Sequence, residues 1–185
     1  PVFSVESALV DGNTRTIEGT FEIPNYLDND GSPGGRLSLD DQGLPVVNPL
    51  HPTYNARFHC VVPDAVTEPV PTVVYGHGLM GDRTQVDFFG TFAAGGTLAA
   101  CATDWLGMSS EDVANLAGIL GDMGRFGEQA DRMLAGQLAF QLLGHLVNGG
   151  FDANPAFQTS DGRPILREDG AVFVGNSQGG ILDRK

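Results

Sequence analysis

Hydrophobic and polar positions follow two different patterns along the chain. In residues 1–60, short β-like segments at 15–23 and 56–62 flank a stretch at 25–52 that is rich in Asp, Gly, Pro and Asn and must form loops or turns. From Pro71 onward, apolar runs alternate with segments of helical spacing. The pattern therefore predicts an antiparallel lead-in, followed by a mostly parallel sheet flanked by helices, which is the α/β class.

Three apolar runs predict the parallel strands. They read PTVVYG at 71–76, TLAACATDW at 97–105 and AVFVG at 171–175. Residues 85–94 have helical spacing between the first two runs, and two further helical segments precede the third. Before that last strand, Asp161-Gly162 predicts a type I′ turn in a small insertion.

The two helical segments between residues 109 and 147 carry boundary signals. Ser109 and Asp112 fit a capping box at the start of the first, and Gly149-Gly150 follows the end of the second, which spans 126–147. Each segment has apolar residues on one face at a spacing of 3.6 residues. The expected faces are Val113, Leu116, Ala117 and Leu120 in the first, and Ala130, Met133, Leu134, Leu138 and Leu142 in the second.

The length of the chain favours one domain. With 185 residues and 41% hydrophobic content, the chain can bury one sizeable core but is too short to argue for two. No internal repeat divides it. We therefore expect residues 1–54 to form the lead-in and residues 55–185 to form the α/β core of the same domain.

The charge of the chain excludes some partners. The formal net charge is −13, with 23 acidic and 10 basic residues, so nucleic acid and anionic membrane surfaces would be repelled. No run of 18 apolar residues predicts a membrane span. The chain opens at Pro1 without a basic and then apolar leader, which suggests a mature or trimmed start and favours a secreted or periplasmic protein.

The sequence offers no metal site. Cys60 and Cys101 are too few for a disulfide scaffold and lack the spacing of metal ligands, so they leave the compartment open. The acidic segment at 28–31 resembles the start of a calcium loop, but the 12-residue spacing that ends in a bidentate Glu is absent. A solvated acidic turn is the better interpretation.

The segment VFVGNSQGGI at 172–181 predicts a nucleophilic serine at a strand-to-helix turn. A Gly-x-Ser-x-Gly pattern directly after an apolar strand is typical of a nucleophile elbow, where the chain reverses so sharply that Ser takes a strained conformation and small residues must flank it. Here Ser177 lies between Gly175 and Gly179. The turn presents the hydroxyl at the carboxyl end of the sheet, and the amide of Gln178 can stabilise an oxyanion there.

A second motif, TVVYGHGLMG at 72–81, ends another strand. In acyl-transfer enzymes with such an elbow, the second oxyanion donor is an amide in the loop after the third strand, which by position is that of Leu79. Together with ATDWLG at 102–107, these motifs make the chain similar to the bacterial lipase and esterase branch of the α/β-hydrolase family. Asn176 stands where the family often has His, at a variable position beside the nucleophile.

The resemblance covers roughly residues 55–182, the first half to two-thirds of such a fold. It implies an eight-stranded, mostly parallel sheet, a covalent acyl-enzyme on Ser177, a small-molecule ester as substrate and no cofactor. In the family the triad continues with Asp or Glu and then His, but no His follows Ser177, and Asp183 is too close to be the usual acid. We therefore expect a fold that is incomplete at the C-terminus, an inactive fragment, and a complementary C-terminal chain or segment that carries the missing residues.

None of the four histidines is a good candidate for the base. His77 belongs to the oxyanion loop, where its ring is expected to brace the turn. His145 is expected to be buried between the long helix and the sheet, while His51 and His59 lie in the lead-in. Asp104-Trp105 could contact substrate, but bracing of the loop is at least as good an interpretation.

Two alternatives stay open at this point. Ser177 could serve acyl transfer or peptide hydrolysis through the same tetrahedral intermediate, or the chain could be a non-catalytic binding protein. In the strand order of the family Cys60 and Cys101 lie on neighbouring strands, and we favour two free thiols over a bridge because directly paired positions give poor disulfide geometry.

Overall fold

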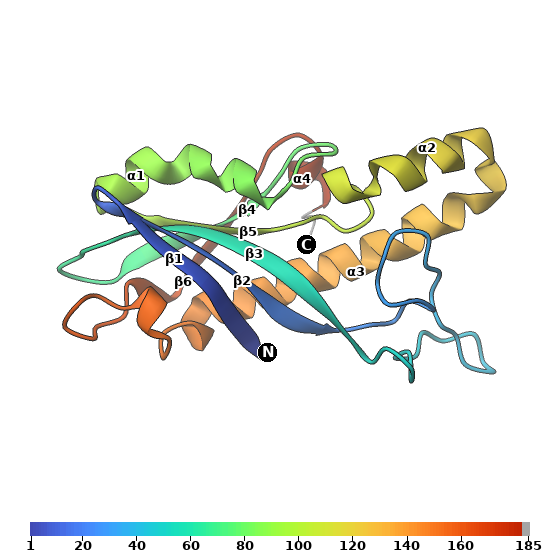
Figure 1. The fold of residues 1–185 in the computed structure, drawn as a ribbon, viewed down its shortest axis with the longest axis horizontal. Helices are drawn as coiled ribbons and strands as arrows, with labels where there is room; N and C mark the ends of the chain where they lie inside the picture. The colour runs from blue at the N-terminus through green and yellow to red at the C-terminus, as the bar shows by residue number, and fades with distance from the viewer. Residues whose placement is uncertain (183–185) are drawn as a thin grey trace.

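The computed structural model of the protein describes residues 1–182, and a six-stranded mixed sheet forms its centre (Figure 1). The strands are β1 (Phe3–Asp11), β2 (Thr14–Pro24), β3 (Thr53–Pro63), β4 (Val70–Gly76), β5 (Ala99–Thr103) and β6 (Leu166–Gly175). The α-helices are α1 (Gly90–Ala94), α2 (Val113–Gly121), α3 (Phe126–His145) and α4 (Gln178–Leu182). Short helices are η1 (Arg83–Phe89), η2 (Ser110–Asp112), η3 (Met123–Arg125), η4 (Leu146–Gly150) and η5 (Pro155–Phe157).

The order of the strands is β1-β2-β3-β5-β4-β6. Pairing is antiparallel from β1 to β5 and parallel from β5 through β4 to β6. The antiparallel lead-in and the parallel strands after Pro71 are thus confirmed, and they belong to one continuous sheet.

Strand β1 is an element that the sequence interpretation missed. It pairs with β2 through a two-residue connection, Gly12-Asn13, in which Gly12 has a φ of 59°. Gly-Asn between two strand-like runs is a hairpin signal, so the local sequence did contain the information.

Helices cover both faces of the sheet, with α1 on one and α3 on the other (Figure 1). The larger core lies on the α3 side and contains five buried phenylalanines, Phe21, Phe58, Phe140, Phe151 and Phe157. The smaller core packs η1 and α1 against the other face. Burial on both faces explains why β4 and β5 read as nearly continuous apolar runs.

The predicted apolar face of α3 is wrong. Leu134 is 51% exposed, and the buried positions are instead Gln129, Arg132, Gly136, Ala139, Phe140 and Leu143. Arg132 is buried because its Nε donates to Oδ1 of Asp112 at 2.6 Å. Gly136 lies in this face because the backbone of Leu106 approaches it so closely that a Cβ would be 2.8 Å from the carbonyl oxygen.

Two smaller expectations also need correction. The capping box of Ser109 and Asp112 is present, but the helix after it buries only Ile119, while Val113 and Leu120 remain exposed. The turn at Asp161-Gly162 exists, but only Gly162 has a positive φ, so the turn is not type I′. Within residues 1–182, no helix has the length and apolar character needed to cross a membrane.

Candidate active site

The two glycine-containing motifs lie side by side at the carboxyl edge of the sheet. Strands β4 and β6 are parallel neighbours, with Gly76 opposite Gly175 in register. The amide of Asn176 donates to the carbonyl oxygen of Gly76 at 3.0 Å. The loop after β4 and the turn after β6 therefore begin next to each other at this edge, as expected for two motifs that each follow a parallel strand.

The turn after β6 has the backbone geometry of a nucleophile elbow. Ser177 has a φ of 53°, in the left-handed region that an L-residue with a side chain rarely takes, and α4 begins at the next residue. A Cβ on Gly175 would lie 2.3 Å from the carbonyl carbon of Gly179, and one on Gly179 would lie 2.2 Å from the carbonyl oxygen of Gly76. Both glycines are thus required by backbone contacts, which confirms the predicted strain and crowding around Ser177.

His77 braces the loop after β4, as predicted. Its ring is fully buried, and the amide of Trp105 donates to Nε2 at 2.8 Å. Because Nε2 accepts, Nδ1 carries the proton of a neutral ring and donates to the carbonyl oxygen of Gly78 at 2.8 Å. Both ring nitrogens are engaged, so His77 has no nitrogen left to act as a base.

The two amides that the sequence singled out have no partner within residues 1–182. The neighbouring amides are used: that of Gly78 donates to Oε1 of Gln85 at 3.1 Å, and that of Met80 donates to the carbonyl oxygen of Met108 at 3.1 Å. No bond from the amide of Leu79 or Gln178 accompanies them. Both amides remain available to an acceptor.

The loop after β5 lies at the same edge of the sheet and contacts the loop after β4. Oδ1 of Asp104 accepts from the amide of Arg83 at 2.8 Å, and Oδ2 accepts from Nη1 of Arg83 at 2.9 Å. Asp104 and Trp105 therefore brace the loop between β4 and η1. Nearby, the hydroxyl and amide of Thr84 donate to Asp82 and hold the pKa of this carboxyl below its usual range.

The remaining histidines do not reach Ser177. His145 is exposed on α3, so its expected burial against the sheet is wrong. His51 is exposed in the lead-in, and both ring nitrogens of His59 face carboxylates. Asp183 lies outside the described residues. The hydroxyl of Ser177 accordingly has no hydrogen-bonded base within residues 1–182.

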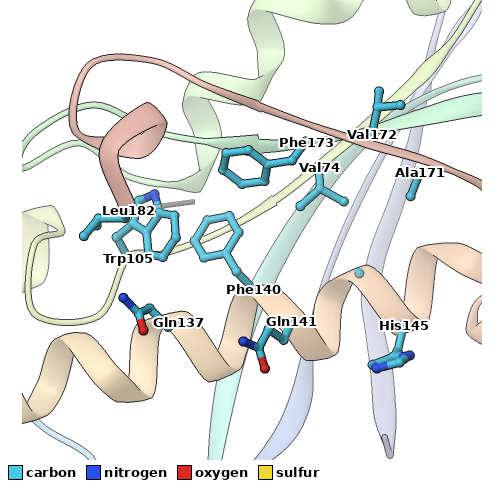
Figure 2. A pocket seen from close by; sticks show the side chains of 11 residues that line it. Val74, Trp105, Gln137, Phe140, Gln141, His145, Ala171, Val172, Phe173 and Leu182 are labelled. Atoms are coloured by element: carbon cyan, nitrogen blue, oxygen red, sulfur yellow. The ribbon is translucent and has the colours of Figure 1, made fainter. Parts of the chain in front are cut away.

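A pocket of about 540 Å³ lies between α3 and strands β4 and β6 (Figure 2). Three aromatic side chains, Trp105, Phe140 and Phe173, gather near Leu182 of α4, and Gln141 and His145 project from α3 farther along. The rings of Trp105 and Phe140 stack with centroids 3.8 Å apart. Neither Ser177 nor Leu79 lines this pocket, so it is separate from the elbow.

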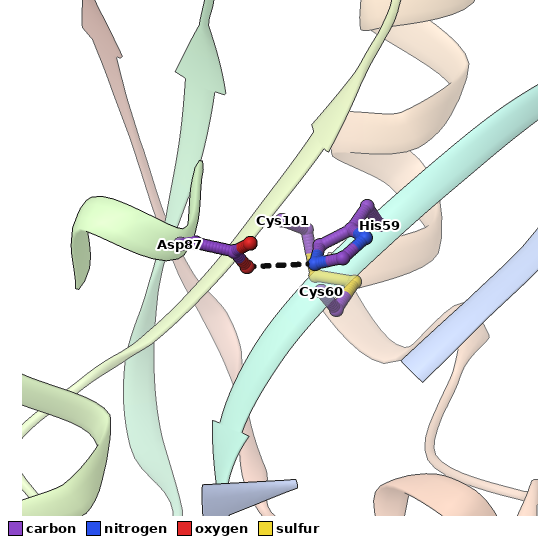
Figure 3. The surroundings of a disulfide bond; sticks show 4 residues. All are labelled: His59, Cys60, Asp87 and Cys101. Atoms are coloured by element: carbon purple, nitrogen blue, oxygen red, sulfur yellow. Dashed lines mark hydrogen bonds and ion pairs between the residues drawn. A yellow bond between two sulfur atoms is a disulfide. The ribbon is translucent and has the colours of Figure 1, made fainter. Parts of the chain in front are cut away.

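The expectation of free thiols is wrong. Cys60 and Cys101 are bridged, with their Cα atoms 4.0 Å apart (Figure 3). They lie directly opposite each other on β3 and β5, as expected from the strand order. Antiparallel strands bring some directly opposed residues within about 4.5 Å, which makes a cross-strand bridge accessible.

His59, next to this disulfide, lies between two carboxylates, an arrangement that the sequence did not reveal. Its Nε2 lies 2.8 Å from Oδ1 of Asp87 on η1 (Figure 3). Its Nδ1 lies 3.0 Å from Oε1 of Glu18 on β2. The ring is buried. The group connects three elements on the face opposite α3 and is distant in the sheet order from the elbow on β6.

Comparison with known proteins gives the fold. No protein-family model and no curated protein sequence matches the chain. A Bacteroides fragilis protein assigned as an acetyl xylan esterase is similar in structure, with a TM-score of 0.54 and 13% identity over 98% of this chain and 43% of that one. Acetyl xylan esterases from Paenibacillus sp. R4 and Thermoanaerobacterium sp. give TM-scores of 0.46 and 0.48, with 14% and 17% identity, over 98% of this chain and 47% of each of theirs.

The chain thus spans less than half the length of these structures. At 13% identity, the first likeness shows the fold alone. Together with the strand order, it shows that residues 1–182 have a partial α/β-hydrolase fold.

Proposed function

We propose that the protein is a serine hydrolase of carboxylic esters that works through an acyl-enzyme on Ser177. The observation that carries the proposal is the backbone of Ser177, whose φ of 53° between two sterically required glycines exposes the hydroxyl at the carboxyl edge of the sheet. Such strain at a polar residue is characteristic of functional sites. The acetyl xylan esterases with a similar fold are consistent with this reaction class.

The amides of Leu79 and Gln178 would stabilise the negative charge of the tetrahedral intermediate. Both are unpartnered within residues 1–182, and both belong to loops that meet at Gly76. Donors that are held in place before the reaction stabilise the transition state without a cost of reorganisation. Water molecules in their place would have to reorient as the negative charge develops, which costs free energy.

The base that activates Ser177 would come from outside these 185 residues. Ser needs a neighbouring base to lose its proton, and a carboxylate must hold that base in the correct tautomer. The histidines of the chain are engaged or distant, as described above. We therefore propose that a further segment or a complementary chain supplies a His and an acid.

The disulfide between Cys60 and Cys101 also bears on the location of the protein. Such bonds persist in oxidising compartments and are rare in the cytosol. We propose a secreted or periplasmic enzyme on this ground.

The test compares the 185-residue chain with the longer natural reading frame, each incubated with a short-chain chromogenic ester and with a fluorescent phosphonate. We expect the longer protein to hydrolyse the ester and to be labelled, and Ser177→Ala to abolish both. Ser4→Ala is the matched control, because Ser4 is exposed on β1, at the opposite side of the sheet from β6, and has no assigned role. The 185-residue chain should retain no more than the residual 10³–10⁴-fold acceleration over water that is typical when triad members are lost.

Three outcomes would change the interpretation. If the short chain matches the longer one and loses its rate on Ser177→Ala, a histidine within the chain is the base. If Ser177 is labelled but no ester is hydrolysed, acyl transfer or peptide hydrolysis replaces ester hydrolysis. If neither protein is labelled, the fold serves binding and the proposal is wrong.

A further inference from the structure

A polar pocket lies at the same edge of the sheet, on the side of β3 and β5. Its volume is about 410 Å³, and every residue that lines it is polar. The lining consists of Tyr54, Asn55, Arg57, Arg83, Asp104, Ser109, Ser110 and Glu111. In the order β3-β5-β4-β6, strand β3, which carries Arg57, lies three strand spacings or about 15 Å from the elbow after β6.

The acidic groups of this pocket already have cationic partners. Asp104 accepts two hydrogen bonds from Arg83, and Glu111 lies 3.1 Å from Nη2 of the buried Arg132. Arg83 serves Asp104 alone, whereas Arg132 is shared between Glu111 and Asp112, whose Oδ1 accepts from its Nε at 2.6 Å.

The basic groups of the pocket are not all satisfied. Arg57 is exposed, and its guanidinium makes no ion pair within residues 1–182, in contrast to Arg83 and Arg132. Nε of Arg83 is buried and likewise lacks a partner in that part of the chain. Arg57 is thus a guanidinium without an anionic partner in the described part of the chain, and Arg83 keeps one spare donor, in a protein whose net charge is −13.

Neutral donors complete the lining. Burial raises the pKa of Tyr54, and the charge of Glu111 raises it further, so the phenol stays protonated at neutral pH and can donate. Ser110 adds an exposed hydroxyl. The spare donors therefore include both guanidinium and hydroxyl groups.

We propose that this pocket binds a carboxylate group of the substrate, with Arg57 as its counter-ion. A guanidinium matches the planar geometry of a carboxylate. A carboxylate brings one negative charge to this one unpaired guanidinium, whereas a phosphate dianion would bring a second beside Asp104 and Glu111. The inference rests on the proposed function for its second half: the substrate is an ester whose carboxylate, bound to Arg57 on β3, lies about 15 Å from the carbonyl that Ser177 attacks.

The binding half is tested without catalysis. Propionate, its neutral isostere propionamide and inorganic phosphate are titrated into the protein and followed by nuclear magnetic resonance shifts. We expect propionate to bind more tightly than the other two, and Arg57→Gln to weaken its binding about tenfold or more, because a hydrogen bond to a charged group contributes roughly 1.5–3 kcal/mol. Arg167→Gln is the control, since Arg167 is exposed on β6 and does not line the pocket.

The substrate half compares two chromogenic esters of equal length in the longer protein, 4-nitrophenyl dodecanoate and the mono-4-nitrophenyl ester of dodecanedioic acid, whose chain is long enough to reach Arg57. Arg57→Gln should lower kcat/KM for the dodecanedioate ester about tenfold and leave the dodecanoate unchanged. Equal binding of propionate by the wild type and Arg57→Gln, or tighter binding of phosphate, would overturn the assignment. If neither ester is hydrolysed while propionate still binds through Arg57, the proposed function fails and the carboxylate site stands.

Discussion

The crowding around Gly179 makes a sharp prediction about the elbow. A Cβ at this position would lie 2.2 Å from the carbonyl oxygen of Gly76, 2.5 Å from the carbonyl carbon of Gly76 and 2.9 Å from the carbonyl oxygen of His77. All three neighbours are backbone atoms, so no side chain can rotate away. Gly179→Ala must therefore push the elbow away from the end of β4.

The size of the effect follows from the nature of the contact. Adding a methyl group to a packed interior costs about 1–3 kcal/mol and occasionally more. Because the neighbours belong to paired strands, we expect the upper end of this range for Gly179→Ala, about 3 kcal/mol. For a chain of 185 residues, this corresponds to a decrease in Tm of roughly 6–12 °C. Gly179→Val is larger still, and we expect it to be insoluble or unfolded.

Thermal unfolding followed by circular dichroism measures this decrease. Gly144→Ala is the matched control, because a Cβ at Gly144 of α3 meets no atom within 4 Å. This variant should keep or raise Tm, since Ala is favoured over Gly in a helix by about 1 kcal/mol. If Gly179→Ala unfolds at the wild-type temperature, or Gly179→Val is soluble and fully native, the elbow geometry is wrong.

Two further predictions concern stability. The double variant Cys60→Ala/Cys101→Ala removes a bridge between residues 41 positions apart and should lower the free energy of unfolding, measured in urea, by about 2–4 kcal/mol. The wild type should show no reactive thiol under denaturing, non-reducing conditions, and two reactive thiols would contradict the bridge. Burial, and then the charge of Glu168, raises the pKa of Asp152 above 3.8, so the folded state holds this proton more tightly and loses stability as the pH rises through the raised value. Asp152→Asn should therefore raise Tm at pH 7 and give no gain at pH 3, and an equal gain at both pH values would exclude titration of this group as the cause.

The elements near the candidate site could be predicted because their signals are local. The strands that lead to Gly76 and Gly175 are apolar runs, and each ends at a glycine that leaves no room for a Cβ, because Gly76 faces the ring of Phe173 and Gly175 faces the backbone of Gly179. The bracing role of His77 also followed from its place beside a tight turn. These features depend on a few adjacent residues, so the sequence contains them.

The buried face of α3 could not be found in this way. Apolar spacing selects the face with Leu134, but the helix turns Arg132 inward because Asp112, Glu111 and the carbonyl oxygen of Gly31 accept from its guanidinium. Those partners come from the lead-in and from η2, far away in the sequence. A buried cation is stable only when such partners surround it, and hydropathy does not encode them.

The same reasoning explains why the backbone of the candidate site is well defined although no base is hydrogen-bonded to Ser177 within residues 1–182. The loop after β4 is held by Trp105 and Asp104, which follow β5, and by Asn176, which follows β6. Each contact joins segments that are distant in sequence but adjacent in the sheet order. These contacts hold the backbone on both sides of the amides of Leu79 and Gln178. If these amides act as the proposed oxyanion donors, a segment that brings a His and an acid would add proton transfer to donors that the chain already holds in place, and such preorganised donors stabilise charge without a cost of reorganisation.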